Sequence, residues 1–295
     1  MRKTLFALGG ILAVLFVLLS LLDSRGDYVA EKMIWKVNQG LYNASLAPEA
    51  VPDNVYEQIA SQYQQIIRDF PGSNLVPLAY IFLGRVYILK KDYGTARTEL
   101  THVLKKYPAN EAICAEAVSV IGNSYELEGN WPEALKIYEK IKVDYPLTDL
   151  GLNAPLYIAN YYVQNGHSVN AQNAFNDAIV YYTEISSKHP NSEIEYKSLQ
   201  LLSNCYLMQK RWDEAVKVMG DILLKYPMTK MAMPLIQSIN AVTLTHIKNF
   251  DIAIAIYQNF IEKNPRNPLD KTLQEMIAAF DELKKKNVNT ATKDS

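Results

Sequence analysis

Prolines recur along this chain at nearly constant intervals, each one after an aromatic or polar residue. A proline cannot continue a helix, and it pushes the residue before it out of helical geometry, so each of these prolines marks a helix end. The six are Pro71, Pro108, Pro146, Pro190, Pro227 and Pro265, with spacings of 37, 38, 44, 37 and 38 residues. A period in the high thirties leaves room for two helices per unit, which is typical of a solenoid whose units bury their apolar faces against their neighbours.

The segment 77–108 shows what lies between two such prolines. At helical period its apolar residues form two stripes, which predicts two helices joined by a short turn. Gly84 and Ala96, one on each helix, have almost no side chain, so two antiparallel helices can approach each other closely there. The same twelve-residue step, with a proline twelve residues later, occurs at Gly84–Ala96, Gly122–Ala134, Ser203–Ala215 and Ala241–Ala253.

These positions resemble the tetratricopeptide repeat, whose two helices carry a leucine-glycine pair, a tyrosine, a Gly-Asp-Tyr-like turn, alanines and a closing proline. Ser203 and Ala241 replace the glycine, and Asn240 replaces the leucine. The resemblance covers roughly residues 77–265 and implies an α-solenoid of helical hairpins. The matching turns are Lys91-Asp92-Tyr93, Gly129-Asn130-Trp131, Lys210-Arg211-Trp212 and Lys248-Asn249-Phe250.

The fourth unit is longer than the others. Counting forward from Ala159 places the second small residue at Ala171, whereas counting back from Pro190 places it at Ala178. The difference of seven residues is about two helical turns, so an insertion of this length keeps the packing stripe in phase. We therefore predict one longer helix over residues 170–188.

The N-terminal sequence that precedes the repeats indicates a membrane anchor. Arg2 and Lys3 precede an uncharged run over residues 5–22, long enough for about 27 Å of helix against a hydrocarbon core of about 30 Å. No Ala-x-Ala cleavage pattern follows, so we expect an uncleaved, single-pass signal anchor rather than a removed signal peptide. The positive residues then stay in the cytoplasm, and the remainder of the chain crosses the membrane.

The expected organisation is all-α. We predict a first helix over residues 28–42 that is amphipathic through Val29, Met33, Trp35, Val37 and Leu41, and that belongs to an atypical terminal unit. The predicted segments are a cytoplasmic N-terminus (1–4), a transmembrane anchor (5–22), a linker with a divergent first helical unit (23–71), five tetratricopeptide-like units (72–265), a capping helix (266–286) and a disordered tail (287–295).

Composition excludes several function classes. The 30 basic and 31 acidic residues give a net charge of −1, which favours neither nucleic acid nor an acidic substrate. No phosphate loop, nucleophile elbow or zinc spacing occurs, and the four histidines fall in different repeats. Cys114 and Cys205 lie too far apart in a regular stack to form a disulfide. We therefore predict no enzymatic activity, no catalytic or metal site, no cofactor and no small-molecule substrate.

The resemblance to the tetratricopeptide family also implies a binding surface, because the first helix of each unit lines the inside of the superhelix. The residue after the small position then points into a groove, where an asparagine can offer a donor and an acceptor to an extended peptide. The family's clamp for a C-terminal carboxylate needs lysines, but the matching places hold Ile81, Ser119 and Leu156, so no clamp is expected. The predicted groove residues are Arg85, Asn123, Asn160, Asn204 and Val242, with Leu127 and Met208 adding apolar contacts.

Three functions remain open from the sequence. The short proline punctuation (FPGS, YPLT, HPNS, YPMT) resembles bacterial envelope tetratricopeptide proteins of the BamD-like and YbgF-like families. That resemblance implies a scaffold in the inner membrane with periplasmic repeats, acting in envelope or outer-membrane protein assembly. An accessory subunit of the protein-export machinery is the alternative, and a subunit of an enzyme complex is the third.

Overall fold

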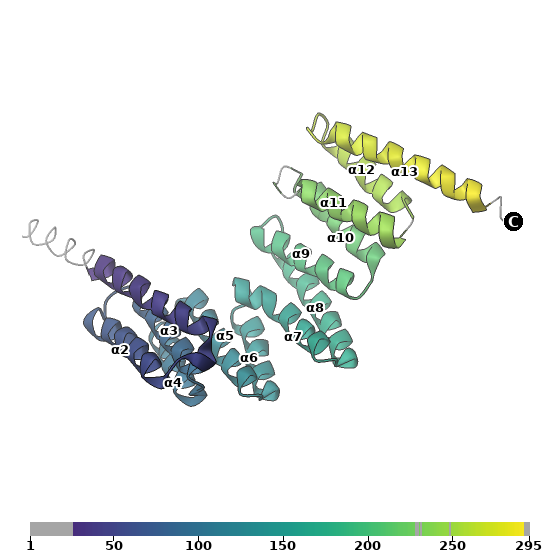
Figure 1. The fold of residues 1–295 in the computed structure, drawn as a ribbon. Helices are drawn as coiled ribbons and strands as arrows, with labels where there is room; N and C mark the ends of the chain where they lie inside the picture. Colours follow the sequence, from purple (N-terminus) through teal and green to yellow (C-terminus); the bar gives the residue numbers. More distant parts are fainter. Residues whose placement is uncertain (1–25, 228–229, 231, 248, 292–295) are drawn as a thin grey trace, which may run out of the picture. The chain divides into compact units, whose positions relative to one another are not determined.

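The computed structural model describes residues 26–227, 230, 232–247 and 249–291, which fold into helices joined by short turns (Figure 1). Among these residues no strand occurs. Two compact units divide the chain, one up to Gly151 and one from Leu152 onward. The all-helical repeat fold predicted from the sequence is therefore confirmed.

The first unit is a series of helices in which neighbours along the chain are neighbours in space. Each of α2 to α5 packs on the helix that follows it, and α3 also contacts α5, as the stacking of two-helix repeats requires. The elements are the helix over residues 26–46, the short 3-10 turn η1 (Pro48–Ala50), α2 (Asp53–Asp69), α3 (Val76–Leu89), α4 (Tyr93–Lys106), α5 (Glu111–Leu127) and α6 (Trp131–Asp144).

The second unit continues the alternation up to the last helix. Its elements are α7 (Asp149–Gln164), which begins just before the division, α8 (Ser168–Lys188), α9 (Glu193–Met208), α10 (Trp212–Lys225), α11 (Ala232–Val242), the π-helical η2 (Thr243–Ile247), α12 (Asp251–Lys263) and α13 (Asp270–Ala291). The C-terminal helix thus extends beyond the predicted boundary at residue 286 and includes part of the tail that we expected to be disordered.

A shared tyrosine ends the first helix of four repeats in the same way. The carbonyl of Tyr87 accepts a hydrogen bond from the N–H of Asp92, five residues on, at 2.8 Å. Between them Lys91 takes a positive φ of 63°, the left-handed residue that commonly terminates helices. The equivalent bonds are Asn130 to Tyr125, His167 to Tyr162 and Arg211 to Tyr206, and the equivalent left-handed residues are Gly129, Gly166 and Lys210.

The prolines end the second helices as predicted. In each case the residue before the proline leaves helical geometry but still donates its N–H to the carbonyl four residues back, as Tyr107 does to Val103 at 2.9 Å. The other helices that end in this way do so at Phe70, Tyr145, His189, Tyr226 and Asn264. Each period of the sequence therefore contains two helix ends, one after the shared tyrosine of the first helix and one before the proline that follows the second helix.

The small residues lie where two helices cross. A Cβ on Gly84 would lie 2.7 Å from the Leu100 side chain, and one on Gly122 would lie 2.7 Å from the Tyr138 ring. Ala96 and Ala134 on the facing helices are fully buried. Both crossings therefore have no space for a larger side chain.

We expect Ala134→Leu to destabilise the first unit by about 1–3 kcal/mol, because the added atoms must displace packed neighbours. Ala112→Leu is the matched control, since Ala112 is exposed near the start of α5. Urea unfolding of the two variants would measure the difference. Equal midpoints for Ala134→Leu and Ala112→Leu would show that the predicted repeat register is wrong.

The longer fourth unit contains a single continuous helix, as predicted. Helix α8 spans 21 residues from Ser168 to Lys188. Both candidate small positions, Ala171 and Ala178, are buried, as are Phe175 and Tyr182, four residues after each of them. The seven-residue insertion therefore keeps one packing face, and the Tyr182 hydroxyl anchors it to α7 by donating to the Leu152 carbonyl at 2.8 Å.

The last repeat departs from the predicted crossing. Ala241 is exposed, so the prediction that it meets Ala253 at a close approach is wrong. Helix α11 ends one residue later and widens into η2, which rotates the side chains that follow. Helix α12 packs instead on α10, where a Cβ on Gly220 would lie 2.7 Å from Ile256.

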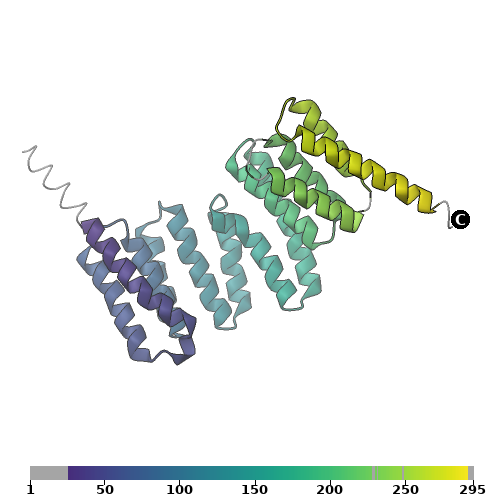
Figure 2. The ribbon, with the colours of Figure 1, turned by 45° about the horizontal axis from the view of Figure 1, so that its top comes forward.

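The first helix also presents a different face from the predicted one. It packs on α2 (Figure 2) through a buried stripe that contains Val37 and Leu41 but neither Val29 nor Trp35, which are exposed. The amphipathic pattern predicted from the sequence included both Val29 and Trp35 on its apolar side, and for these two residues it was wrong. The remaining buried residues of this face are Ala30, Ile34 and Ala44.

The predicted membrane segment, residues 5–22, lies outside the described residues. Among the helices that the structure describes, none is both long and apolar enough to cross a membrane. Both cysteines are buried and free. Burial raises the pKa of the Cys205 thiol to about 12, as expected for a small packing residue rather than a nucleophile.

Candidate functional site

The first predicted groove residue is already engaged by a neighbouring repeat. Arg85 on α3 forms an ion pair with Glu116 on α5, and its guanidinium carbon lies 6.0 Å from the centre of the Phe82 ring. The arginine and glutamate side chains are 45% and 31% exposed. The surface that α3 and α5 share here is therefore open to solvent and has no net charge from this pair.

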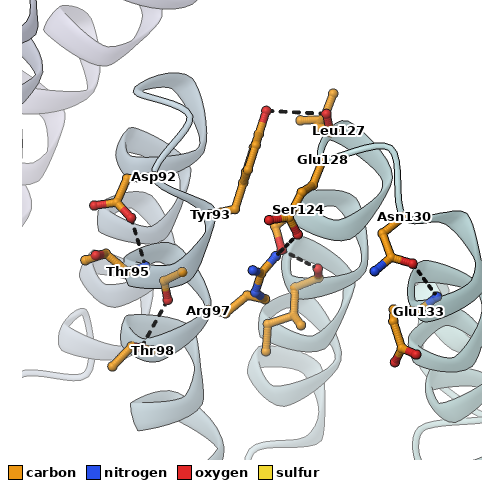
Figure 3. Close-up of polar contacts among 12 residues, drawn as sticks. Asp92, Tyr93, Thr95, Arg97, Thr98, Ser124, Leu127, Glu128, Asn130 and Glu133 are labelled. Atoms are coloured by element: carbon orange, nitrogen blue, oxygen red, sulfur yellow. Dashed lines mark hydrogen bonds and ion pairs between the residues drawn. The ribbon is translucent and has the colours of Figure 1, made fainter.

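Asn123 and Leu127 follow on the same helix, α5. Asn123 is half-buried, and Leu127, at the last residue of the helix, is 56% exposed. Figure 3 shows the Tyr93 hydroxyl from the start of α4 donating to the Leu127 carbonyl at 3.4 Å. The exposed Leu127 is thus the last residue of α5, and Tyr93 of the preceding repeat contacts this helix end.

Arg97 on α4 adds further contacts to the end of α5. Its guanidinium bonds Glu128 at 2.9 Å and the Ser124 hydroxyl at 3.3 Å (Figure 3). The same group lies 4.2 Å from the centre of the Tyr125 ring, a cation–π contact. An arginine that uses its plane and its edge together fixes orientation better than a lone ion pair, so α4 positions the surface that carries Asn123 and Leu127.

The second unit holds the other predicted residues. Asn204 on α9 is exposed, and Met208, at the end of that helix, is 51% exposed. Asn160 is half-buried on α7. Met208 of this unit and Leu127 of the first unit are therefore equivalent, because each is an exposed apolar residue that ends a first helix of its repeat.

The series of predicted groove residues does not continue regularly into the last repeat. Val242 is half-buried and is the final residue of α11, directly before the π-helical segment. Asn240, two residues earlier, accepts a hydrogen bond from the buried Tyr257 hydroxyl at 2.7 Å. The asparagine of this repeat is therefore structural.

The structure places Arg85 on α3 and Asn123 and Leu127 on α5, two first helices of the first unit that contact each other, and places Asn204 and Met208 one turn apart on α9 in the second. That all of them line one groove stays a prediction. Sequence reasoning missed Glu116 and Arg97. The available signal was the repeat itself, since Glu116 lies seven residues before Asn123 on the same helix.

Three of the four histidines of the chain lie against aromatic rings. His102 contacts the Tyr80 ring at 6.0 Å between centres, His167 contacts Tyr162 at 6.2 Å, and His246 stacks on Trp212 at 4.0 Å. Within the part of the chain that the structure describes, no three histidine, cysteine or acidic residues are arranged to hold a metal ion.

Glu195 is the most enclosed charged residue described, and it fixes a helix start. Its side chain accepts from the Asn191 N–H at 2.6 Å, while the Ser192 hydroxyl accepts from the Glu195 N–H at 3.1 Å, a variant of the capping box. Lys225 and the Tyr226 hydroxyl, at the end of α10, bond the same carboxylate at 2.6 and 2.8 Å. Burial opposes ionisation, but these bonds outweigh it and hold the pKa of Glu195 below its usual value.

Two segments of the chain match a family model. Residues 121–148 and 197–227 match the tetratricopeptide repeat. The first segment contains the end of α5 and all of α6, and the second contains most of α9 and all of α10. No curated protein matches the sequence. The matched segments therefore coincide with helical hairpins that carry Asn123, Leu127, Asn204 and Met208.

Several solved structures are similar in arrangement at low identity. The TPR2AB domain of yeast Sti1, solved in a pHSP90 complex, is 14% identical, with 87% of this chain and 97% of that chain covered and a TM-score of 0.34. A tetratricopeptide repeat protein from Parabacteroides merdae is 13% identical, with 84% and 98% covered and a TM-score of 0.36. A putative protein-binding protein from Bacteroides ovatus is 19% identical, with 70% and 98% covered and a TM-score of 0.27.

Proposed function

We propose that this tetratricopeptide-repeat protein is a non-enzymatic scaffold that holds an extended segment of another protein along the first helices of its repeats. The observation that carries the proposal is the surface of α3 and α5, two first helices in contact, which carry the Arg85–Glu116 pair, Asn123 and the exposed Leu127. Tetratricopeptide repeats serve in general as protein-interaction scaffolds, whose concave surfaces are built from successive units.

The side chains indicate the kind of segment that would bind. Asn123 and Asn204 can each offer a donor and an acceptor to a peptide backbone. Leu127 and Met208 offer apolar contacts nearby. Because Arg85 is paired with Glu116, the surface does not favour a strongly charged tail, and Ile81 at the clamp position is fully buried. The ligand we propose is therefore an uncharged, partly apolar segment in the interior of the partner's chain, and not its C-terminus.

The proposed location is a bacterial inner membrane, with the repeats on the periplasmic side. Arg2 and Lys3 before the uncharged run at 5–22 support this orientation. The process we propose is envelope or outer-membrane protein assembly, on the resemblance of the proline punctuation. An accessory role in the protein-export machinery uses the same surface and differs only in the partner.

Site-specific photocrosslinking in native membranes tests the binding surface. A photoreactive residue at Asn123 or Asn204 is expected to give a discrete adduct with one partner, whereas the same residue at Lys140 on the second helix of its repeat gives none. Lys140 is a suitable control because it is an exposed residue of α6 in the same hairpin as Asn123.

The triple change of Asn123, Asn160 and Asn204 to alanine is expected to leave folding intact and abolish partner capture. Circular dichroism of the purified variant checks the folding. Unchanged capture, or equal adducts at Lys140 and Asn123, would move the interface to the second helices and contradict the proposal.

A further inference from the structure

The helix over residues 26–46 has apolar residues on two opposite faces. One face forms the buried stripe against α2, in which residues recur every three or four positions. Because a helix turns by about 100° per residue, that spacing confines the buried residues to a single side. The Tyr63 hydroxyl from α2 donates to the Asn38 side chain at the edge of this contact.

The opposite face carries aromatic side chains that point into solvent. Tyr28, Trp35 and Tyr42 recur at intervals of seven and are 66%, 65% and 61% exposed, and Leu46, one turn further on, is 67% exposed. A seven-residue step drifts by only about 20° on a straight helix, so the four side chains form one line. We call Tyr28, Trp35, Tyr42 and Leu46 the aromatic stripe.

The last helix shows what a water-facing end of this chain looks like. Helix α13 buries Leu273 and Phe280 against α12, and over residues 270–286 its exposed side chains include Lys271, Glu275 and Glu282 but no large apolar one. A terminal repeat that ends in water needs such a polar outer face. On the first helix, by contrast, the four exposed apolar side chains of the aromatic stripe lie among exposed polar residues such as Lys32 and Gln39, which indicates that the stripe meets something other than water.

The composition of the stripe points to a lipid surface. Tyrosine and tryptophan have an apolar body and one polar group, so they are enriched where hydrocarbon meets water. The uncharged run at 5–22 is long enough to enter a bilayer, and the stripe begins six residues after it. We propose that the aromatic stripe lies in the headgroup region of the membrane and holds the first repeat against it.

The charges beside the stripe fit zwitterionic lipid. Asp27, Glu31, Lys32 and Lys36 bring two negative and two positive charges to this helix. They provide neither net attraction to anionic lipid nor repulsion from it. Neutral phosphatidylcholine is therefore a sufficient surface, and binding should depend on the aromatic groups.

A second copy of this chain fits the stripe less well. A helix pair in a coiled coil needs two apolar positions per seven residues, whereas the stripe supplies one over most of its length. The four side chains also offer less area than the roughly 800 Å² per partner that a stable interface buries. A lipid surface, unlike a second helix, does not require apolar residues at two positions of each seven.

Fluorescence of Trp35 in the full-length chain tests the proposal, which rests on the proposed membrane attachment. Trp131→Phe and Trp212→Phe leave Trp35 as the single tryptophan of the chain. In phosphatidylcholine vesicles containing lipid brominated near the headgroup end of its acyl chains, most of the Trp35 emission should be lost. A matched chain that keeps only Trp212, a residue of α10, should keep its emission.

Two further measurements separate the possible failures. Tyr28→Ser with Tyr42→Ser in the Trp35-only chain should restore much of the emission, since these exposed residues are not needed for folding. Emission of Trp35 that survives in vesicle-bound protein contradicts this inference but leaves the anchor standing. A chain that does not float with vesicles contradicts both, and a crosslinked dimer with unquenched Trp35 assigns the stripe to a second copy.

Discussion

Glu195→Ala is expected to lower the free energy of unfolding around α9 and α10 by about 2–3 kcal/mol. Breaking a fully buried ion pair costs about 3–5 kcal/mol, and the effect here is smaller because the Lys225 side chain is 36% exposed. The loss has two physical sources. Lys225 and Tyr226 lose their acceptor, and α9 loses half of its capping box.

Native-state hydrogen exchange of α9 and α10 would measure the change, because repeats can open separately. Glu214→Ala is a control within the same unit, since Glu214 pairs with Arg211 at 2.9 Å on a more exposed surface, where about 0–1 kcal/mol is expected. An effect of Glu195→Ala no larger than that of Glu214→Ala would contradict the role assigned to Glu195.

The same carboxylate predicts a pH dependence with a definite sign. The pKa of Glu195 is lower in the folded protein than its usual value of 4.5, so the folded state favours the ionised form. Its stabilisation is present above the unfolded pKa and disappears as the pH falls through the folded pKa. The stability difference between the native chain and Glu195→Gln should therefore be constant near neutral pH and shrink below pH 4.5. A difference that grows on acidification would contradict this assignment.

Tyr257→Ala is expected to destabilise the last repeat by about 3–5 kcal/mol, the cost of removing a large buried side chain. Tyr257 is fully buried on α12, and its ring stacks with Phe280 of α13 at 6.5 Å between centres. Its hydroxyl donates to the Asn240 side chain at 2.7 Å. Because α12 packs on α10 more than on its own partner helix, this tyrosine is a main link between α11 and the end of the chain.

Tyr257→Phe separates the two contributions. It keeps the ring and removes the hydroxyl, so about 1–2 kcal/mol is expected from the lost hydrogen bond. Thermal unfolding and hydrogen exchange of α12 and α13 would measure both variants. Equal effects of the alanine and phenylalanine variants would mean that the cavity is filled by rearrangement and that Tyr257 does not support the last repeat.

The sequence by itself determined the repeats, because their signals are local. The six repeat prolines stop the helices before them, and the residue five positions after each shared tyrosine closes the first helix through a backbone bond. The seven-residue insertion could also be interpreted without a structure, since helical geometry alone keeps Ala171 and Ala178 on one face. The same repeat register predicted Asn123 and Asn204 one position after the small residue of their helices, and that they line one groove stays a prediction.

Only the tertiary structure decided which partner each face meets. The first helix can bury either of two apolar faces, and contact with α2 selected Val37 and Leu41 and left Trp35 outside. Packing of α12 on α10 similarly left Ala241 exposed. Glu116 became visible as the partner of Arg85 only when two repeats were stacked. Side-chain spacing fixes the faces of a helix, whereas the choice between them depends on the area that neighbouring helices can bury together.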